Sequence, residues 1–276
     1  MGQEVSHSHF TEEEMTLFRQ RLIAETKLLK QQFEDGLFSS CAPVGGFEIE
    51  GWLLDDKMKP ASVNDAFFEA LNNPLATPEL AKFNIELNNL PLPLKADAFN
   101  QFERDMLAVY DDARKAAIAV DSDVVLVGIL PTLEARDCSL ANMSEMKRYH
   151  ALNDVVFKIR EGRPLLFDIH AKDSLTMESD NLMFEAATTS FQIHMQMPWQ
   201  QAHHYYNASI IASAPLMAMA ANAPLLFSKQ LWQETRIPLF EQSVDTGDGL
   251  RRVSFGTGYA KESIVECFEE NLQEFA

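Results

Sequence analysis

Basic residues are scarce in this sequence, and their scarcity excludes several classes of function. The chain has 276 residues, with 23 Lys and Arg against 41 Asp and Glu, and a formal net charge of −18. Binding to a nucleic-acid backbone or to an anionic lipid surface requires clustered cations. We therefore expect neither nucleic acid nor a membrane among the partners. An anionic ligand such as ATP would need metal cations or local basic groups to offset the negative charge of the protein.

Cysteine is also rare, and the three cysteines have no spacing typical of a metal or redox site. Unpaired thiols suit a reducing compartment. The polar, acidic N-terminus is not typical of a signal peptide. Residues 208–227 carry no charge, but two prolines and many small or polar residues favour a buried helix over a membrane span. The sequence thus predicts a cytoplasmic protein and leaves open whether it forms a homo-oligomer.

Hydrophobic periodicity predicts helices mixed with strands. A capping box of Thr11 and Glu14 begins the clearest helix. No strand runs into a glycine-rich turn and a helix, so an α+β fold in a single domain, residues 1–276, is favoured over a doubly wound sheet. We expect helices at residues 11–35, 61–72, 96–119, 205–221 (kinked or broken at Pro215) and 263–275, and strands at 44–54, 83–90, 123–129, 163–170 and 188–197.

Paired carboxylates stand out in the first expected strand. Glu48 and Glu50 alternate with Phe47 and Ile49, so the two acids share one face of the strand, about 7 Å apart. They are either the solvated side of an amphipathic strand or two ligands of a hard divalent cation, which prefers oxygen ligands on rigid elements.

Two further strands add an acid and an imidazole. Glu86 is flanked by Ile85 and Leu87, while Gln192 and His194 alternate with apolar neighbours. Each is ordinary alone, as a solvated or hydrogen-bonded strand residue. If the three strands are neighbours in one sheet, however, their polar faces form one carboxylate–imidazole metal site.

Two arginines are candidates for an anionic group of the ligand. Arg236 follows the apolar 205–221 helix, and Arg148 precedes His150. A lone arginine is usually a surface ion pair. Beside an acidic sheet, a semi-buried guanidinium can instead hold a phosphate or a carboxylate through two parallel hydrogen bonds.

Six segments, in this order, resemble the bacterial and plant-type glutamate–cysteine ligases and their carboxylate–amine ligase relatives. Together they cover roughly residues 44–260, and they are more specific for the family than for the substrate. They are GGFEIEGWLL, NIELNNLPL, VVLVGILPTL, SFQIHMQM, APLMAMAANAPLLF and ETRIPLFEQSVD.

The resemblance implies a glutamine-synthetase-like fold, in which a curved, mostly antiparallel sheet with helices on one face forms a funnel over metal and ATP. It implies Mg²⁺, with Mn²⁺ as a possible substitute, on Glu48, Glu50 and Glu86. It assigns His194 to the metal or the nucleotide phosphates, with Gln192 beside it, and Arg236 to catalysis, near the substrate carboxylate or the transferred phosphate. Arg148, a candidate from the sequence pattern alone, is expected to contact the nucleotide. It also implies a further C-terminal section carrying another metal-binding glutamate, which would leave the domain incomplete here, and Ala223 stands where relatives often have serine.

The implied activity joins a glutamate-like carboxylate to a cysteine-like amine through an acyl phosphate, as in glutathione biosynthesis. Two alternatives stay open: a non-catalytic remnant of the fold that still binds nucleotide, and a metal-dependent hydrolase that uses the same face. ADP release that depends on the amine would separate the ligase from both.

Overall fold

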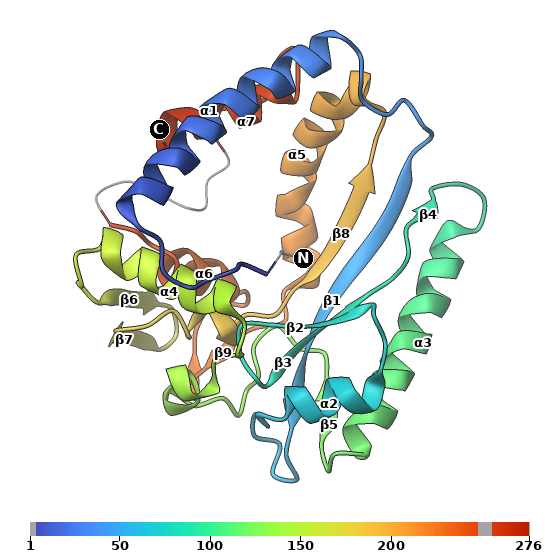
Figure 1. Ribbon diagram of the computed structural model, residues 1–276. Helices are drawn as coiled ribbons and strands as arrows, with labels where there is room; N and C mark the ends of the chain where they lie inside the picture. Colours follow the sequence, from blue (N-terminus) through green and yellow to red (C-terminus); the bar gives the residue numbers. More distant parts are fainter. Residues whose placement is uncertain (1–3, 248–255, 276) are drawn as a thin grey trace.

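The computed structural model describes residues 4–247 and 256–275 (Figure 1). Its helices are α1 (Glu12–Glu34), α2 (Asn64–Leu71), α3 (Ala98–Ile118), α4 (Lys147–Ile159), α5 (Ala202–Ala220), α6 (Arg236–Ser243) and α7 (Val265–Phe275). Its strands are β1 (Val44–Leu54), β2 (Ala76–Pro78), β3 (Asn84–Asn88), β4 (Leu92–Pro93), β5 (Asp123–Val125), β6 (Leu165–His170), β7 (Ser174–Ser179), β8 (Phe191–Gln196), β9 (Leu225–Leu226) and β10 (Lys229–Gln230).

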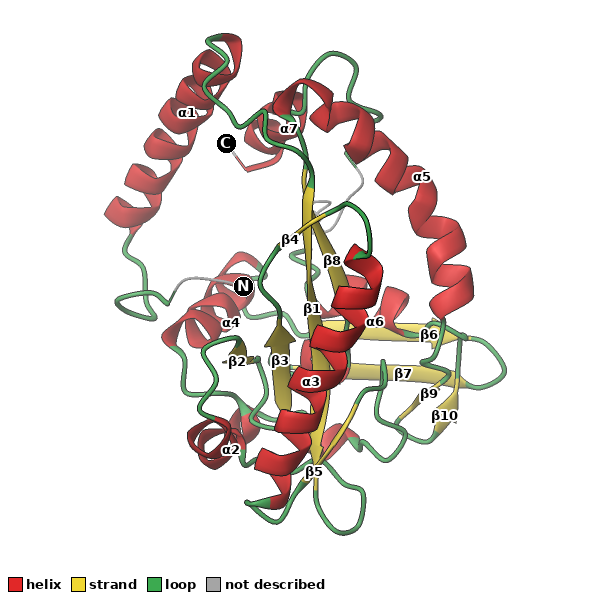
Figure 2. Ribbon diagram, turned by 90° about the vertical axis from the view of Figure 1, so that its right-hand side faces the viewer, coloured by secondary structure: helices red, strands yellow, loops and turns green. Residues whose placement is uncertain are grey.

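The long strand β1 organises the main sheet, as Figure 2 shows. It pairs antiparallel with β3 and β8 on either side, and with the short strands β4 and β5, while β2 extends the sheet beyond β3. Two smaller antiparallel sheets, β6–β7 and β9–β10, lie apart from it. The α+β class and the antiparallel pairing expected from the sequence are therefore confirmed.

One face of this sheet packs against α2 and α3. Phe47, Ile49 and Leu53 of β1 and the apolar residues of β3 meet Phe67 and a row of alanines on α3. Small residues let the helix approach the sheet closely, and the apolar alternation of β1 and β3 turns one side of each strand into this core.

The opposite face of the sheet is also covered, at the C-terminal end of β1. Trp52 and Leu54 extend into a second core with the β6–β7 hairpin and with buried residues from 129 to 187. Trp52 stacks on Phe83 at 5.5 Å between ring centroids and donates its indole N–H to the carbonyl of Val127 at 2.9 Å. The expectation of helices on one face therefore misses a second layer, which encloses the polar side of β1.

Helix α5 differs most from the prediction. It runs unbroken through Pro215, and none of its residues is buried, although it has no charged residue. Helix α1 also leaves Phe18 61% exposed and packs along α7, where Lys30 and Glu269 form an ion pair at 2.7 Å. The expectation of a buried helix within residues 208–227 is therefore wrong for its helical part. Within the described ranges, the structure contains no helix with the length and apolar character of a membrane span.

Most other predicted elements are present. One predicted strand is too long, and several short elements were not predicted. The strand expected at 123–129 ends at Val125, because the chain then leaves the sheet and the Val127 carbonyl accepts hydrogen bonds from Trp52 and Thr189. Helices α4 and α6 and strands β2, β4, β7, β9 and β10 have no counterpart in the prediction.

Candidate functional site

The four acid and imidazole residues proposed from the sequence lie on one face of three neighbouring strands. In the register of the sheet, Glu50 lies opposite Glu86 of β3, and Glu48 lies opposite Gln192 of β8. His194 Nε2 lies 3.2 Å from Glu48 Oε1. The strands that carry these residues are thus adjacent, as the metal-site hypothesis requires, and this face belongs to the enclosed side of β1.

Glu50 is held in place from the edge strand. The backbone N–H and the hydroxyl of Ser190 donate to its two carboxylate oxygens at 2.8 and 2.7 Å, and Gln192 Nε2 donates at 3.4 Å. Burial raises the pKa of Glu50, the bonds from Ser190 oppose this rise, and the charge of Glu86 adds to it. The rotamer of Glu50 is therefore fixed while its negative charge is only partly compensated.

Glu86 is 1% exposed and is fixed from two sides. Thr77 Oγ1 and Asn88 Nδ2 donate to the same oxygen, Oε1, at 2.9 and 2.7 Å. Burial by itself would raise the pKa of Glu86, but the hydrogen bonds from Asn88 and Thr77, together with smaller contributions that include a hydrogen bond from Glu79, lower the pKa below its ordinary value. Glu86 is therefore ionised at neutral pH.

Glu79 is a fourth acid of the cluster, and the sequence prediction missed it. Burial, followed by the charges of Glu50 and Glu86, raises the pKa of Glu79 to about 8, and its carboxyl group hydrogen-bonds to that of Glu86. At neutral pH Glu79 therefore holds a proton that it donates to Glu86. Thr77 and Glu79 are two residues apart, the spacing that places strand residues on one face. Pro78 between them argues against a strand, so the sequence alone does not indicate this shared face.

An unsatisfied amide lies next to these acids. Asn84 is 3% exposed, precedes Glu86 by two residues in β3 and therefore points to the same face. Its Nδ2 finds no hydrogen-bond acceptor within the described part of the chain. A buried donor without an acceptor is rare in folded proteins and is expected where a bound molecule supplies the acceptor.

Arg148 lies at the border of the cluster. Its guanidinium donates to the hydroxyl of Tyr149 at 2.8 Å and lies 4.7 Å from the centre of that ring. The Tyr149 hydroxyl in turn donates to the carbonyl of Pro78, next to Glu79, at 3.2 Å. Burial, and then the charge of Glu79, raises the pKa of Tyr149. Arg148 is thus linked to the acids through one aromatic side chain.

Arg236 is engaged by the protein itself. Its Nε and Nη2 donate to both oxygens of Glu234 at 2.5 and 2.6 Å, and its Nη1 donates to the carbonyl of Thr189 at 2.7 Å. Thr189 directly precedes Ser190, which holds Glu50. The position of Arg236 is therefore coupled to the acid cluster through the backbone before β8.

The donor set fits magnesium in the form in which magnesium usually binds. Among residues 4–247 and 256–275, no three His, Cys, Asp or Glu side chains already surround one point closely enough to hold an ion together. Mg²⁺, however, is commonly bound by one or two carboxylates together with water and substrate phosphates, rather than by a cage of protein ligands. Glu50 and Glu86, fixed opposite each other, supply such a pair.

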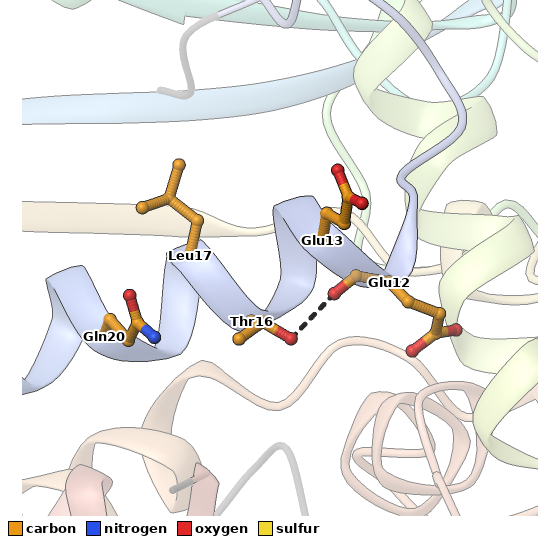
Figure 3. Close-up of a pocket in the computed structure, with 5 residues that line it drawn as sticks. All are labelled: Glu12, Glu13, Thr16, Leu17 and Gln20. Atoms are coloured by element: carbon orange, nitrogen blue, oxygen red, sulfur yellow. Dashed lines mark hydrogen bonds between the residues drawn. The ribbon is translucent and has the colours of Figure 1, made fainter.

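A separate surface hollow lies on the first turns of α1 (Figure 3). Its lining consists of Glu12, Glu13, Thr16, Leu17 and Gln20, all from one helix. The single interaction drawn among them is the bond from the Thr16 hydroxyl to the Glu12 carbonyl at 2.8 Å, which is internal to the helix. The hollow therefore presents no convergent polar groups, unlike the β1–β3–β8 face.

Comparison with known proteins adds no assignment. No model of a known protein family matches the chain, and no curated protein matches it either.

Proposed function

We propose that this protein is an ATP- and Mg²⁺-dependent ligase that joins a carboxylate to an amine through an acyl phosphate. The observation that carries the proposal is the enclosed group of Glu50, Glu79 and Glu86, which are held together although they repel one another. A buried cluster of like charges is costly unless protons or a cation neutralise part of it, and here Glu79 takes up a proton in the absence of a metal. The order of the six sequence motifs supports the choice of this reaction.

Each residue has a defined part in the proposed reaction. Glu50 and Glu86 bind the metal, and Glu48 supports His194, which faces the phosphates with Gln192. When bound, magnesium offsets the charge that develops as the γ-phosphoryl group moves to the substrate carboxylate. Arg148 and Arg236 are assigned to the nucleotide and to the transferred group or substrate carboxylate.

Glu79 acts in this proposal as the acid that responds to the cation. Its proton keeps the metal-free cluster at a lower negative charge, and a divalent cation favours loss of that proton because it stabilises the carboxylate. The cluster then presents its full charge when the metal is present. Amine attack on the acyl phosphate releases the phosphate and completes the amide.

The test is ADP release by the full chain with Mg²⁺, ATP, glutamate and a panel of amines. We expect release that depends on both substrates, and a loss of about 100-fold or more in Glu86→Gln, because a second carboxylate of the metal pair is gone. Gln keeps the shape of Glu86 and can still accept from Thr77 and Asn88. Glu178→Gln, an exposed strand glutamate of β7, is the matched control and should retain full activity.

Three outcomes contradict the proposal. Equal turnover in wild type and Glu86→Gln would remove the role of Glu86. Binding of ATP and Mg²⁺ without ADP release would identify a nucleotide-binding protein that does not catalyse ligation. Cleavage of amides without ATP would identify a metal-dependent hydrolase.

A further inference from the structure

The side chain of Asn84 lies on the same face as the acid cluster, and the proposed reaction gives it no part. Strands β2, β3 and β1 lie side by side (Figure 2), and the register places Asn84 opposite Trp52 of β1. The register of β2 with β3 reaches Pro78, so Glu79 follows at the level of Asn84 on the other side. Residues opposite each other in neighbouring strands have Cβ atoms about 5 Å apart. Asn84 therefore lies between an aromatic ring and an acid.

Backbone acceptors beside Asn84 receive other donors. The carbonyl of Glu79 accepts from the hydroxyl of Ser144, and the carbonyl of Pro78 accepts from the hydroxyl of Tyr149 at 3.2 Å. These bonds attach the end of β2 to α4 and to the loop that precedes α4. Both carbonyls thus have their own donors, and neither is a partner of the Asn84 amide N–H.

The carboxyl groups of the cluster are engaged as well. Oε1 of Glu86 accepts from Thr77 and Asn88, and the carboxyl groups of Glu79 and Glu86 hydrogen-bond to each other. Asn84 Nδ2 is left without an acceptor among the described residues, although the side chain is only 3% exposed. A donor is therefore enclosed beside several acids and is satisfied by none of them.

The backbone of Asn84 is fixed, so a local movement does not relieve this. Its N–H donates to the carbonyl of Ala81 at 2.9 Å, and the chain just before it is held by the Ser144 N–H, which donates to the carbonyl of Leu80 at 2.9 Å. A buried donor without a partner lowers stability. Such costs are expected where a residue serves binding rather than folding.

The chemistry of the surroundings indicates which acceptor is missing. An amide donates most strongly to a charged acceptor, but the acids around Asn84 repel an anion that comes alone. A divalent cation on Glu50 and Glu86 removes this repulsion, and Mg²⁺ in proteins commonly binds substrate phosphates besides one or two carboxylates. A water molecule on the same cation is a weaker acceptor, because its oxygen points a lone pair at the metal and its protons become more acidic.

We propose that the Asn84 amide donates a hydrogen bond to an anionic oxygen of a ligand that shares a divalent cation with Glu50 and Glu86. This role rests on the proposed function, because ATP and glutamate both supply such an oxygen, as a phosphate or as a carboxylate. Asn84 then strengthens binding of the anionic ligand and contributes nothing to binding of the cation alone.

Asn84→Asp separates these two kinds of binding. Asp keeps the shape of the side chain but replaces the donor with an acceptor oxygen. By calorimetry we expect the variant to bind Mg²⁺ alone at least as tightly as the wild type, because another acid lies beside the site. With Mg²⁺ present, the affinity for ATP or for glutamate should fall by about 10-fold or more. Asn100→Asp, on the exposed surface of α3, adds the same charge and should change neither affinity.

The two ligands are titrated separately. A loss of affinity confined to ATP assigns the oxygen to a phosphate, and a loss confined to glutamate assigns it to the substrate carboxylate. Unchanged affinity for both, weaker binding of Mg²⁺ alone, or a wild type that binds neither ligand would overturn the proposal. Absence of ADP release with these affinity changes intact would contradict the ligase but leave the Asn84 contact standing.

Asn84→Leu tests the unpaired donor without any ligand. Leu has the same number of non-hydrogen atoms and no polar group, so the metal-free variant should unfold in urea at the same or a higher midpoint than the wild type. Asn88→Leu is the matched control: it loses the bond to Glu86 and should unfold at a lower midpoint. A lower midpoint for Asn84→Leu would show that a trapped water or the protein itself pairs with the amide, and would overturn the proposal. If Asn84→Asp does not fold, the Leu variant replaces it in the titrations, with the same loss of ligand affinity expected.

Discussion

Replacement of Glu79 by Gln is expected to stabilise the metal-free protein at neutral and alkaline pH. The folded protein binds a proton at Glu79 up to a pKa of about 8, whereas the unfolded chain releases it near the ordinary value of 4.5. Between these values the native state binds more protons than the unfolded state, so the free energy of unfolding falls as pH rises. The glutamine side chain would carry no titrating group, and its amide can donate to Glu86 as the protonated acid does.

The magnitude follows from the pKa difference. A rise from 4.5 to about 8, at roughly 1.4 kcal/mol per unit, gives an upper limit of about 5 kcal/mol. Glu50 and Glu86 share this repulsion and adjust their own protonation, so part of it is relieved in the wild type. We expect Glu79→Gln to be more stable by about 2–3 kcal/mol at pH 8.5, and equal to the wild type below pH 4.5, where Glu79 is protonated in both states.

Urea unfolding at a series of pH values measures this difference, with Glu178→Gln as the control for loss of an exposed carboxylate. Addition of Mg²⁺ should narrow the gap, because the cation favours loss of the Glu79 proton and therefore stabilises the folded wild type more than the variant, which has no proton to lose at this position. A Glu79→Gln variant that is less stable than the wild type at pH 8.5 would refute the electrostatic account of the cluster. A pH-independent difference would refute it equally.

Two further predictions concern the supports of the fold. A Cβ atom at Gly128 would lie 2.4 Å from Asn222 Oδ1 and 2.8 Å from Arg236 Nε. Gly128→Ala should therefore lower the free energy of unfolding, measured in urea, by about 1–3 kcal/mol. An unchanged unfolding midpoint would contradict this close approach. Hydrogen bonds from backbone N–H groups before α7 lower the pKa of Glu266 to about 2. Because Glu266 is accessible, Glu266→Gln should lower the free energy of unfolding by only about 0.5–1 kcal/mol at pH 7. This loss should disappear as pH falls from 4.5 to 2, where the wild-type carboxylate becomes protonated. A difference in melting temperature that persists at pH 2 would contradict the prediction.

The elements with strong local signals were predictable from the sequence. The capping box of Thr11 and Glu14 forms as expected, with the Glu14 N–H bonded to Thr11 Oγ1 at 3.2 Å. The alternation in β1 and β3 correctly placed Phe47 and Ile85 in a core and the glutamates on the other side. Helix α3 follows its periodicity within two residues at each end. In these cases the chain's own pattern determines both the structure and the buried face.

The remaining features depend on contacts that no local pattern contains. The apolar composition of residues 208–227 favours burial, but burial requires a neighbour, and in the described chain α5 contacts mainly the short turn before it. Likewise, Glu48 is 2% exposed although it lies on the face of β1 that its sequence pattern marks as polar. Alternation identifies two faces of a strand, but only the tertiary structure decides which faces are covered.

The acid cluster likewise depends on tertiary structure that the sequence pattern does not contain. The spacing of Glu48 and Glu50 is visible in the sequence, whereas the pairing of Glu50 with Glu86 depends on a register between strands about 35 residues apart along the chain. A shift of that register by one residue would point Glu86 into the apolar core, where an unpaired carboxylate is costly. The hydrophobic faces of β1 and β3 therefore fix the register, and the register in turn forces the carboxylates together. Packing energy thus holds Glu50, Glu79 and Glu86 together at the cost of a raised pKa at Glu79, and a bound cation would reduce that cost.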